Sequence, residues 1–181
     1  MSQIVQSAID AVNKAEHAFC KFISANDAGI TGAHQSGFYM PKNTIPLMFD
    51  KPQERGTQTK KPIEILWQDD FTTESVFTYY GRKTRNEYRL TRFGRDFPFF
   101  EEDNVGDLFI LAKVSEHNYR GYVLSSDDDI EDFFSAFNMS TTETNKLIRT
   151  EQVPSPKDRI LACFKEYLAK IDLSEFPPTK E

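Results

Sequence analysis

The sequence contains little cysteine and tryptophan, and it has no long apolar run. Two cysteines and one tryptophan occur among 181 residues, and two cysteines are too few for a disulfide scaffold or a structural zinc site. No apolar run approaches the roughly 18 residues of a transmembrane helix. Asp10 and Lys14 interrupt the stretch where a signal peptide would be apolar. These absences predict a cytoplasmic protein with no membrane partner.

The motifs of common catalytic and metal sites are also missing. The three histidines, His17, His34 and His117, have no partners at metal-ligand spacing, and there is no GxSxG, GxGxxG, P-loop or CxxC motif. The usual restriction-nuclease core needs a Glu or Asp followed two positions later by a Lys near the attacked phosphate. The nearest segment, Glu87-Tyr88-Arg89, ends in the wrong cation. We therefore expect no catalytic residue, no metal ligand and no cofactor in this chain.

Charge of one sign is gathered in a short segment. The chain has 28 acidic and 22 basic residues and a net charge of −6, whereas residues 82–95 (RKTRNEYRLTRFGR) contain six cations and one acid, a local charge of 6 − 1 = +5. The other residues therefore sum to −6 − 5 = −11. Because salt screens charges beyond about 8–10 Å, a partner of this segment meets the local positive charge rather than the net charge.

Apolar patterning predicts a mixed, mainly β fold. Helices are predicted at the amino end around 4–12, from the aspartates at 127 to about 137, and near the carboxy end around 155–171. Strands are predicted for HAFCKFIS, QSGFYMP, PIEILWQ, ESVFTYY, LFILAKV and NYRGYVLS. Short strands without strand–helix–strand alternation indicate a barrel-like or sandwich fold. We expect one domain over residues 1–173, followed by a tail at 174–181.

The cationic segment is interpreted as extended. Side chains alternate along a strand, so Lys83, Arg85, Glu87 and Arg89 would share one face. Arg and Lys can donate to O6 and N7 of guanine, and a carboxylate can accept from N4 of cytosine. A glutamate among arginines weakens attraction to phosphate, which favours reading of G·C base pairs in DNA. The alternatives are a solvated ladder of ion pairs worth little, an RNA partner, or a small anionic ligand.

A second candidate is the polar loop 24–39 between two predicted strands. Gly29 and Gly32 can take positive φ there, and short polar side chains and open backbone amides can face a polar partner. Loops of this composition commonly serve only as turns. The loop alone therefore leaves both interpretations open. Its polar residues include Asn26, Asp27, Thr31, His34 and Gln35.

Together, SANDAGITGAHQSGFYMP and GRKTRNEYRLTRFGR resemble the two recognition arms of the amino-terminal DNA-binding domain of EcoRII-type restriction endonucleases. The resemblance covers roughly residues 18–125. It implies a DNA-binding pseudobarrel of short strands with flanking helices, in which two arms grip the major groove of double-stranded DNA. The implied site has two C·G pairs, a central A·T or T·A pair, and two G·C pairs.

The resemblance also assigns roles to residues of both arms. The second arm would read bases with Lys83, Arg85, Glu87 and Arg89, while Arg82, Asn86 and Arg92 support it or hold phosphates. In the first arm, His34 and Tyr39 match binding positions, with neighbours at Ser24, Asn26, Asp27, Thr31 and Gln35. The sequence departs from the family namesake at Ala33 (a glycine there), at Phe93 (a tryptophan) and at Tyr88 (a lysine). Tyr88 stays in the expected DNA-binding set.

In such enzymes this domain binds a copy of the site and regulates or anchors a separate carboxy-terminal nuclease domain, which uses Mg²⁺. The resemblance therefore predicts a non-catalytic domain of a prokaryotic type II site-specific deoxyribonuclease, with that nuclease domain as its partner. Three rival interpretations stand beside it. They are a stand-alone DNA-binding transcription regulator, a complete small nuclease with an unfamiliar site, and a domain that recognises a modified base.

Overall fold

The structure, a computed structural model, describes residues 1–31 and 37–150 of the chain. Within it, Met1–Arg149 group into one compact unit. The helix predicted around 155–171 and the domain boundary predicted at residue 173 lie outside the described residues.

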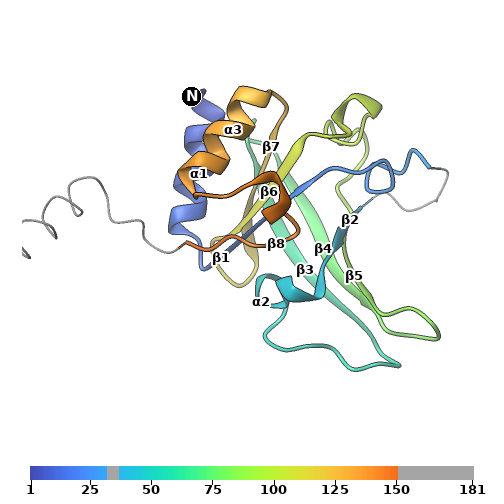
Figure 1. The fold of residues 1–181 in the computed structure, drawn as a ribbon. Helices are drawn as coiled ribbons and strands as arrows, with labels where there is room; N and C mark the ends of the chain where they lie inside the picture. The colour runs from blue at the N-terminus through green and yellow to red at the C-terminus, as the bar shows by residue number, and fades with distance from the viewer. Residues whose placement is uncertain (32–36, 151–181) are drawn as a thin grey trace, which may run out of the picture. The chain divides into compact units, whose positions relative to one another are not determined.

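A single eight-stranded sheet forms the body of this unit (Figure 1). Its spatial order is β2-β5-β4-β3-β7-β6-β1-β8. Neighbouring strands are antiparallel except β3 and β7, which run parallel through 64–67 and 118–121. This parallel pair joins two antiparallel halves, β2-β5-β4-β3 and β7-β6-β1-β8. The strands are β1 (His17–Phe22), β2 (Phe38–Met40), β3 (Gln58–Trp67), β4 (Thr72–Tyr80), β5 (Glu87–Thr91), β6 (Leu108–Lys113), β7 (Asn118–Leu124) and β8 (Lys146–Leu147).

The two longer described helices begin at serine caps. α1 (Gln3–Lys14) follows Ser2, whose Oγ accepts a hydrogen bond from the N–H of Val5 at 3.3 Å. α3 (Asp127–Ala136) follows Ser126, whose Oγ accepts from the N–H of Asp129 at 3.1 Å. Each cap satisfies one backbone donor that the helix itself leaves without a partner. The shorter helices are α2 (Ile45–Met48), η1 (Lys42–Thr44), η2 (Glu102–Asn104) and η3 (Thr141–Glu143).

The sheet curls around a core that is rich in aromatic side chains. Every strand from β1 to β7 contributes at least one buried residue to this core. Phe38 of β2 stacks on Phe109 of β6 with ring centroids 3.9 Å apart, although four strands separate β2 from β6 in the sheet order. Such a contact requires the sheet to bend back towards itself. The predicted barrel-like, mainly β fold is therefore confirmed.

The described helices α1 and α3 cover the outer face of one half of the sheet. They pack against β1, β6 and β7 through a second apolar cluster, which includes Val12, Ile110 and Phe133. The two helices are also joined by a hydrogen bond of 2.8 Å from Ser2 Oγ to the Asp129 carboxylate. The outer face of the other half, β2-β5-β4-β3, carries the polar side chains considered below.

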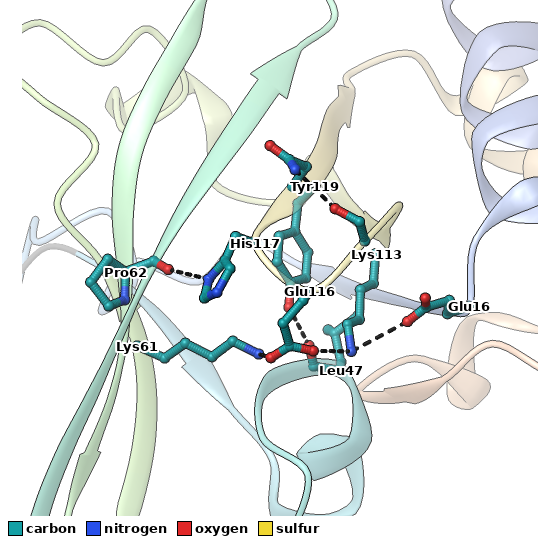
Figure 2. Close-up of polar contacts among 10 residues, drawn as sticks. Glu16, Leu47, Lys61, Pro62, Lys113, Glu116, His117 and Tyr119 are labelled. Atoms are coloured by element: carbon teal, nitrogen blue, oxygen red, sulfur yellow. Dashed lines mark hydrogen bonds and ion pairs between the residues drawn. The ribbon is translucent and has the colours of Figure 1, made fainter.

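A charged network fixes the β6–β7 hairpin to β3 and to the chain before β1 (Figure 2). Glu116 in the hairpin pairs with Lys61 of β3 and, at 3.4 Å, with Lys113 of β6. Lys113 also pairs with Glu16 at 3.3 Å. The hydrogen bond from Lys61 and the charges of both lysines lower the pKa of Glu116 against the opposing effect of desolvation. The network holds the hairpin where the parallel β3–β7 pairing begins.

All six strands predicted from apolar patterning are present, as are the helices predicted at the amino end and from residue 127. The cationic segment contributes one further strand, β5. Residues 42–61, which carry no clear pattern, contain η1, α2 and the start of β3. The two-residue β8 was not predicted, because so short a strand has no detectable period. None of the described helices has the length and apolar character that a membrane crossing requires.

Candidate nucleic-acid interface

A transverse row of side chains crosses the outer face of the β2-β5-β4-β3 half. Tyr39 of β2 lies opposite Arg89 of β5, Arg89 lies opposite Thr78 of β4, and Thr78 lies opposite Lys60 of β3. Residues directly opposite one another on antiparallel strands project to the same side of the sheet. In the next row, Glu87 lies opposite Tyr80. We call these six residues and Arg85, which contacts two of them, the outer-face cluster.

Arg89 is the most buried charged member of this cluster. The residue is 9% exposed, and its Nε and Nη1 atoms have no hydrogen-bond partner among the described residues. Its acidic neighbour is Glu87, whose Oε1 lies 3.8 Å from Nε. Buried polar atoms without partners are uncommon because they lose hydration without gaining a protein hydrogen bond. The two nitrogens are therefore buried donors that lack an acceptor among the described residues.

Glu87 lies between two guanidinium groups. Its Oε1 accepts a hydrogen bond from Arg85 Nε at 2.9 Å and lies near Arg89 on the other side. The Arg85 guanidinium also lies over the Tyr80 ring, 4.4 Å from its centroid, a geometry of favourable cation–π attraction. Arg85, Glu87 and Arg89 thus form one connected group. Of the four side chains predicted to share one strand face, Glu87 and Arg89 do so on β5, and Arg85, which precedes the strand, joins them through its contact with Glu87.

The prediction that Lys83 shares their strand face is wrong. β5 begins only at Glu87, and Lys83 lies in the preceding turn with a φ of +56°. A backbone in the left-handed region breaks the two-residue alternation of a strand. Arg82 and Lys83 are exposed in this turn. Asn86, at its end, accepts a hydrogen bond from the hydroxyl of the core residue Tyr79 at 3.0 Å, so it anchors the turn to the sheet.

Tyr88 does not belong to the accessible surface. It is 2% exposed, its ring packs against Tyr79 with centroids 4.7 Å apart, and its hydroxyl accepts a hydrogen bond from the N–H of Gln53 at 3.0 Å. Tyr88 was expected at the DNA-contacting surface, whereas its side chain packs in the core of this structure. Its neighbours Glu87 and Arg89 point outward because adjacent residues of a strand face opposite sides.

Asp27 is likewise a buried anchor rather than a surface contact. It is 1% exposed, and its Oδ2 atom lies 2.7 Å from the ammonium of Lys21. Burial opposes ionisation, but the charge and hydrogen bond of Lys21, together with hydrogen bonds from Ser24 and the N–H of Tyr39, outweigh it and lower the pKa of Asp27. Asp27 is therefore ionised at neutral pH. Asp27 was expected at the DNA-contacting surface, whereas the structure buries its carboxylate against Lys21.

The remaining predicted site residues are distributed around the cluster. Tyr39 is 39% exposed beside Arg89. Ser24, Asn26 and Thr31 are exposed in the loop before β2. The described start of this loop and the β4–β5 turn both lie to the right of the sheet in Figure 1. Arg92 is exposed just after β5, with a φ of +66°. His34 and Gln35 lie outside the described residues.

Four residues of this region were not found from the sequence. Lys60, Thr78 and Tyr80 enter the cluster only through strand pairing, which local patterns do not specify. Lys21 had a usable signal, because a lysine within the otherwise apolar HAFCKF strand needs a buried partner. The described residues contain no group of three or more His, Cys, Asp or Glu side chains that could hold a metal ion.

The family is decided by a comparison over most of this unit. A family model described as restriction endonuclease EcoRII, N-terminal, matches residues 12–143. The chain belongs to this family. The EcoRII N-terminal match includes all strands from β1 to β7 and both the loop before β2 and the β4–β5 turn.

A curated relative of this EcoRII N-terminal family domain is the type II restriction enzyme EcoRII of Escherichia coli. The two are 36% identical over 103 residues, which is 52% of this chain and 25% of that enzyme. The matched stretch thus spans about a quarter of the relative's length.

Two solved structures also resemble the EcoRII N-terminal family domain. One is the B3 domain of the UbaLAI restriction endonuclease with cognate DNA, which is 18% identical with a TM-score of 0.47 and covers 75% of this chain and 89% of that one. The other is the N-terminal domain of Helicobacter pylori LlaJI.R1, which is 11% identical with a TM-score of 0.37 and covers 59% of this chain and 86% of that one.

Proposed function

We propose that this chain is a sequence-specific duplex-DNA-binding domain of a type II restriction endonuclease. It reads a short site with G·C flanks, of the form CCWGG, from the major groove, and it regulates or anchors a separate Mg²⁺-dependent nuclease domain of the same protein. Family membership supports DNA binding. The burial and chemistry of the outer-face cluster support base reading in particular.

The observation that carries the proposal is Arg89. A guanidinium that only attracts phosphates gains from full exposure, where it can move towards the backbone of the duplex. Arg89 instead is nearly buried, lies beside Glu87, and keeps two nitrogens without hydrogen-bond partners among the described residues. Such fixed donors suit the O6 and N7 acceptors of guanine, which accept two hydrogen bonds from one arginine.

Glu87 supplies the complementary chemistry. Its carboxylate is held by Arg85 through Oε1, and a carboxylate oxygen can accept a hydrogen bond from N4 of cytosine. An acceptor next to fixed donors distinguishes a G·C pair from a C·G pair, because cytosine offers a donor where guanine offers acceptors. The expected roles are therefore guanine for Arg89 and Arg85, cytosine for Glu87, and backbone phosphates for Arg82, Lys83 and Arg92.

The test is a binding selection on randomised duplexes with the wild-type chain and an Arg89→Met variant, followed by anisotropy titrations on the selected site and its single-base variants. Arg89→Met keeps the apolar stem and removes the donors. We expect it to lose discrimination of about 1–3 kcal/mol at one G·C position. The matched control is Arg120→Met, which removes an exposed arginine from β7, on the half of the sheet that α1 covers.

The control variant should select the wild-type sequence with unchanged discrimination. If Arg89→Met also selected that sequence with the same single-base penalties, Arg89 would not be a base reader. If the wild-type chain enriched no sequence at all, specific DNA recognition itself would be wrong.

A further inference from the structure

Asp27 is the centre of a compact set of polar contacts at the base of the first arm. Its Oδ2 accepts hydrogen bonds from the N–H and hydroxyl of Ser24 at 3.0 and 2.6 Å, and its Oδ1 accepts from the N–H of Tyr39 at 2.9 Å. Lys21 completes the set with its ammonium 2.7 Å from Oδ2. One carboxylate thus joins β1, the start of the loop and β2.

Lys21 also contacts Tyr39. Its ammonium donates to the Tyr39 carbonyl at 3.4 Å, so the N–H and the C=O of Tyr39 are bound by Asp27 and Lys21. Both groups of Tyr39 are therefore directed away from β5. In an antiparallel ladder this makes Tyr39 and Arg89 a non-hydrogen-bonded pair, the kind in which opposite side chains approach most closely.

The loop is closed at the same place by its backbone. The N–H of Gly37 donates to the carbonyl of Asp27 at 2.8 Å. Gly37 leaves no room for a larger residue, because a Cβ there would lie 2.7 Å from the carbonyl oxygen of Leu90 in β5. The base of the arm is therefore held to β1 through Lys21 and packed against β5 through Gly37.

A buried ion pair is a weak source of net stability, because removing both charges from water offsets most of their attraction. Its clear effect is geometric, since each charge requires its partner in one place. Both side chains here are nearly inaccessible, and every polar contact given above leads to the arm or to Tyr39.

We propose that the Lys21–Asp27 pair is a positioning device that fixes the described base of the first arm and sets Tyr39 against Arg89, and that it controls sequence discrimination more than general DNA affinity. The inference rests on the proposed function, because discrimination has meaning only if the domain reads bases. Arg82, Lys83 and Arg92 lie outside the pair's contacts, so attraction to phosphates is independent of it.

The test compares the ratio of specific to non-specific duplex affinity in the wild-type chain, in Asp27→Asn and in the double variant Lys21→Met/Asp27→Asn. An amide nitrogen can accept neither the hydrogen bonds from Ser24 nor the one from the N–H of Tyr39, so Asp27→Asn breaks the set of contacts in either orientation of the amide. The double variant removes both buried charges together and protects the fold against an unpaired lysine. We expect the ratio to fall about tenfold in both variants, similar to one lost base contact, with non-specific affinity within about twofold.

Lys113→Met is the matched control. Lys113 is also a nearly buried lysine with carboxylate partners, but it lies in the β6–β7 network of Figure 2 and not at the arm. It should lower thermal stability without changing the affinity ratio. Hydrogen exchange of the Tyr39 and Gly37 amides adds a second readout, and exchange there should become faster in the Asp27 variants while β6 stays protected.

Failure of the proposed function and failure of the positioning role give different results. If the wild-type chain has no preference among duplexes, the proposed function fails and this inference fails with it. If the wild-type chain discriminates and both Asp27 variants keep its ratio, only the positioning role is overturned. A fall of the ratio in Lys113→Met equal to that in Asp27→Asn would also overturn it, because general destabilisation would then explain the loss.

Discussion

Arg89 combines a permanent charge with a position that restricts its movement. Its neighbours on the sheet are Tyr39 and Thr78, and Glu87 offsets part of its charge. A guanidinium fixed in this way has already lost rotamer freedom in the free protein, so less entropy is lost when it binds a planar acceptor. An exposed arginine such as Arg82 in the β4–β5 turn keeps its rotamer freedom in the free protein and loses more entropy on binding.

Arg82 provides the contrasting prediction for a mobile cation. It is exposed in the β4–β5 turn, and we expect Arg82→Ala to weaken binding of the selected site and of a scrambled duplex by the same factor. Each lost phosphate contact should reduce the slope of log affinity against log salt by about one unit. Anisotropy titrations at several NaCl concentrations measure both effects. A change of preferred sequence would show instead that Arg82 contacts a base.

The sequence predicted the polar residues of this site unevenly. Strand alternation correctly grouped Glu87 with Arg89, and the alternate residues Tyr88 and Leu90 are buried on the opposite face. It failed at Lys83, because a left-handed turn residue has no signature when it is not glycine. The burial of Asp27 was also hidden, since a loop aspartate resembles an exposed turn residue until its lysine partner is known.

At the scale of elements, the parallel joint between β3 and β7 depends on a close approach of backbone and indole. Gly121 lies opposite Trp67 in this pair, and a Cβ at residue 121 would lie 2.7 Å from two atoms of the Trp67 ring. Two contacts restrict Trp67. The ring of Phe97 packs against it with centroids 4.8 Å apart, and its indole N–H donates a hydrogen bond to the Thr73 hydroxyl at 3.0 Å.

We expect Gly121→Ala to destabilise the domain by about 1–3 kcal/mol, the usual effect of forcing extra volume into a packed core. Urea unfolding followed by tryptophan fluorescence measures this change. Thr72→Ala, at an exposed position of β4, is the control and should change the free energy of unfolding by less than about 0.5 kcal/mol. Equal stability of Gly121→Ala and the wild type would mean that the joint tolerates a wider spacing.

Most elements could be predicted from the sequence, but their arrangement could not. Apolar runs such as LFILAKV identify strands because the spacing of apolar residues within a short window predicts the element they form. The pairing of β3 with β7 in parallel joins residues more than fifty positions apart, and no local pattern encodes it. β8 forms only because two residues reach the free edge of β1.

At the scale of the whole molecule, a net charge of −6 coexists with a segment of charge +5. The described fold holds this segment in the β4–β5 turn, in β5 and in the residues that follow. Concentrated charge of one sign attracts a polyanion locally even where the net charge of the chain is negative. Strong salt dependence of binding is therefore compatible with an acidic isoelectric point.

We expect the chain alone to leave supercoiled plasmid intact in the presence of Mg²⁺. The sequence has no Glu or Asp followed two positions later by Lys, and the proposed role assigns cutting to another domain. Agarose electrophoresis after a long incubation checks this, with a Mg²⁺-dependent restriction enzyme in the same buffer as the positive control. Discrete fragments produced by the chain would favour the complete small nuclease over the proposed role.

The sheet ends on both sides in very short strands. β2 has three residues and β8 has two, so little backbone at either border is regular enough to pair with a strand from another molecule. Long free borders are the usual starting points for intermolecular sheet growth. The fold therefore limits its own tendency to polymerise, which matters for a protein that concentrates along a polyanion.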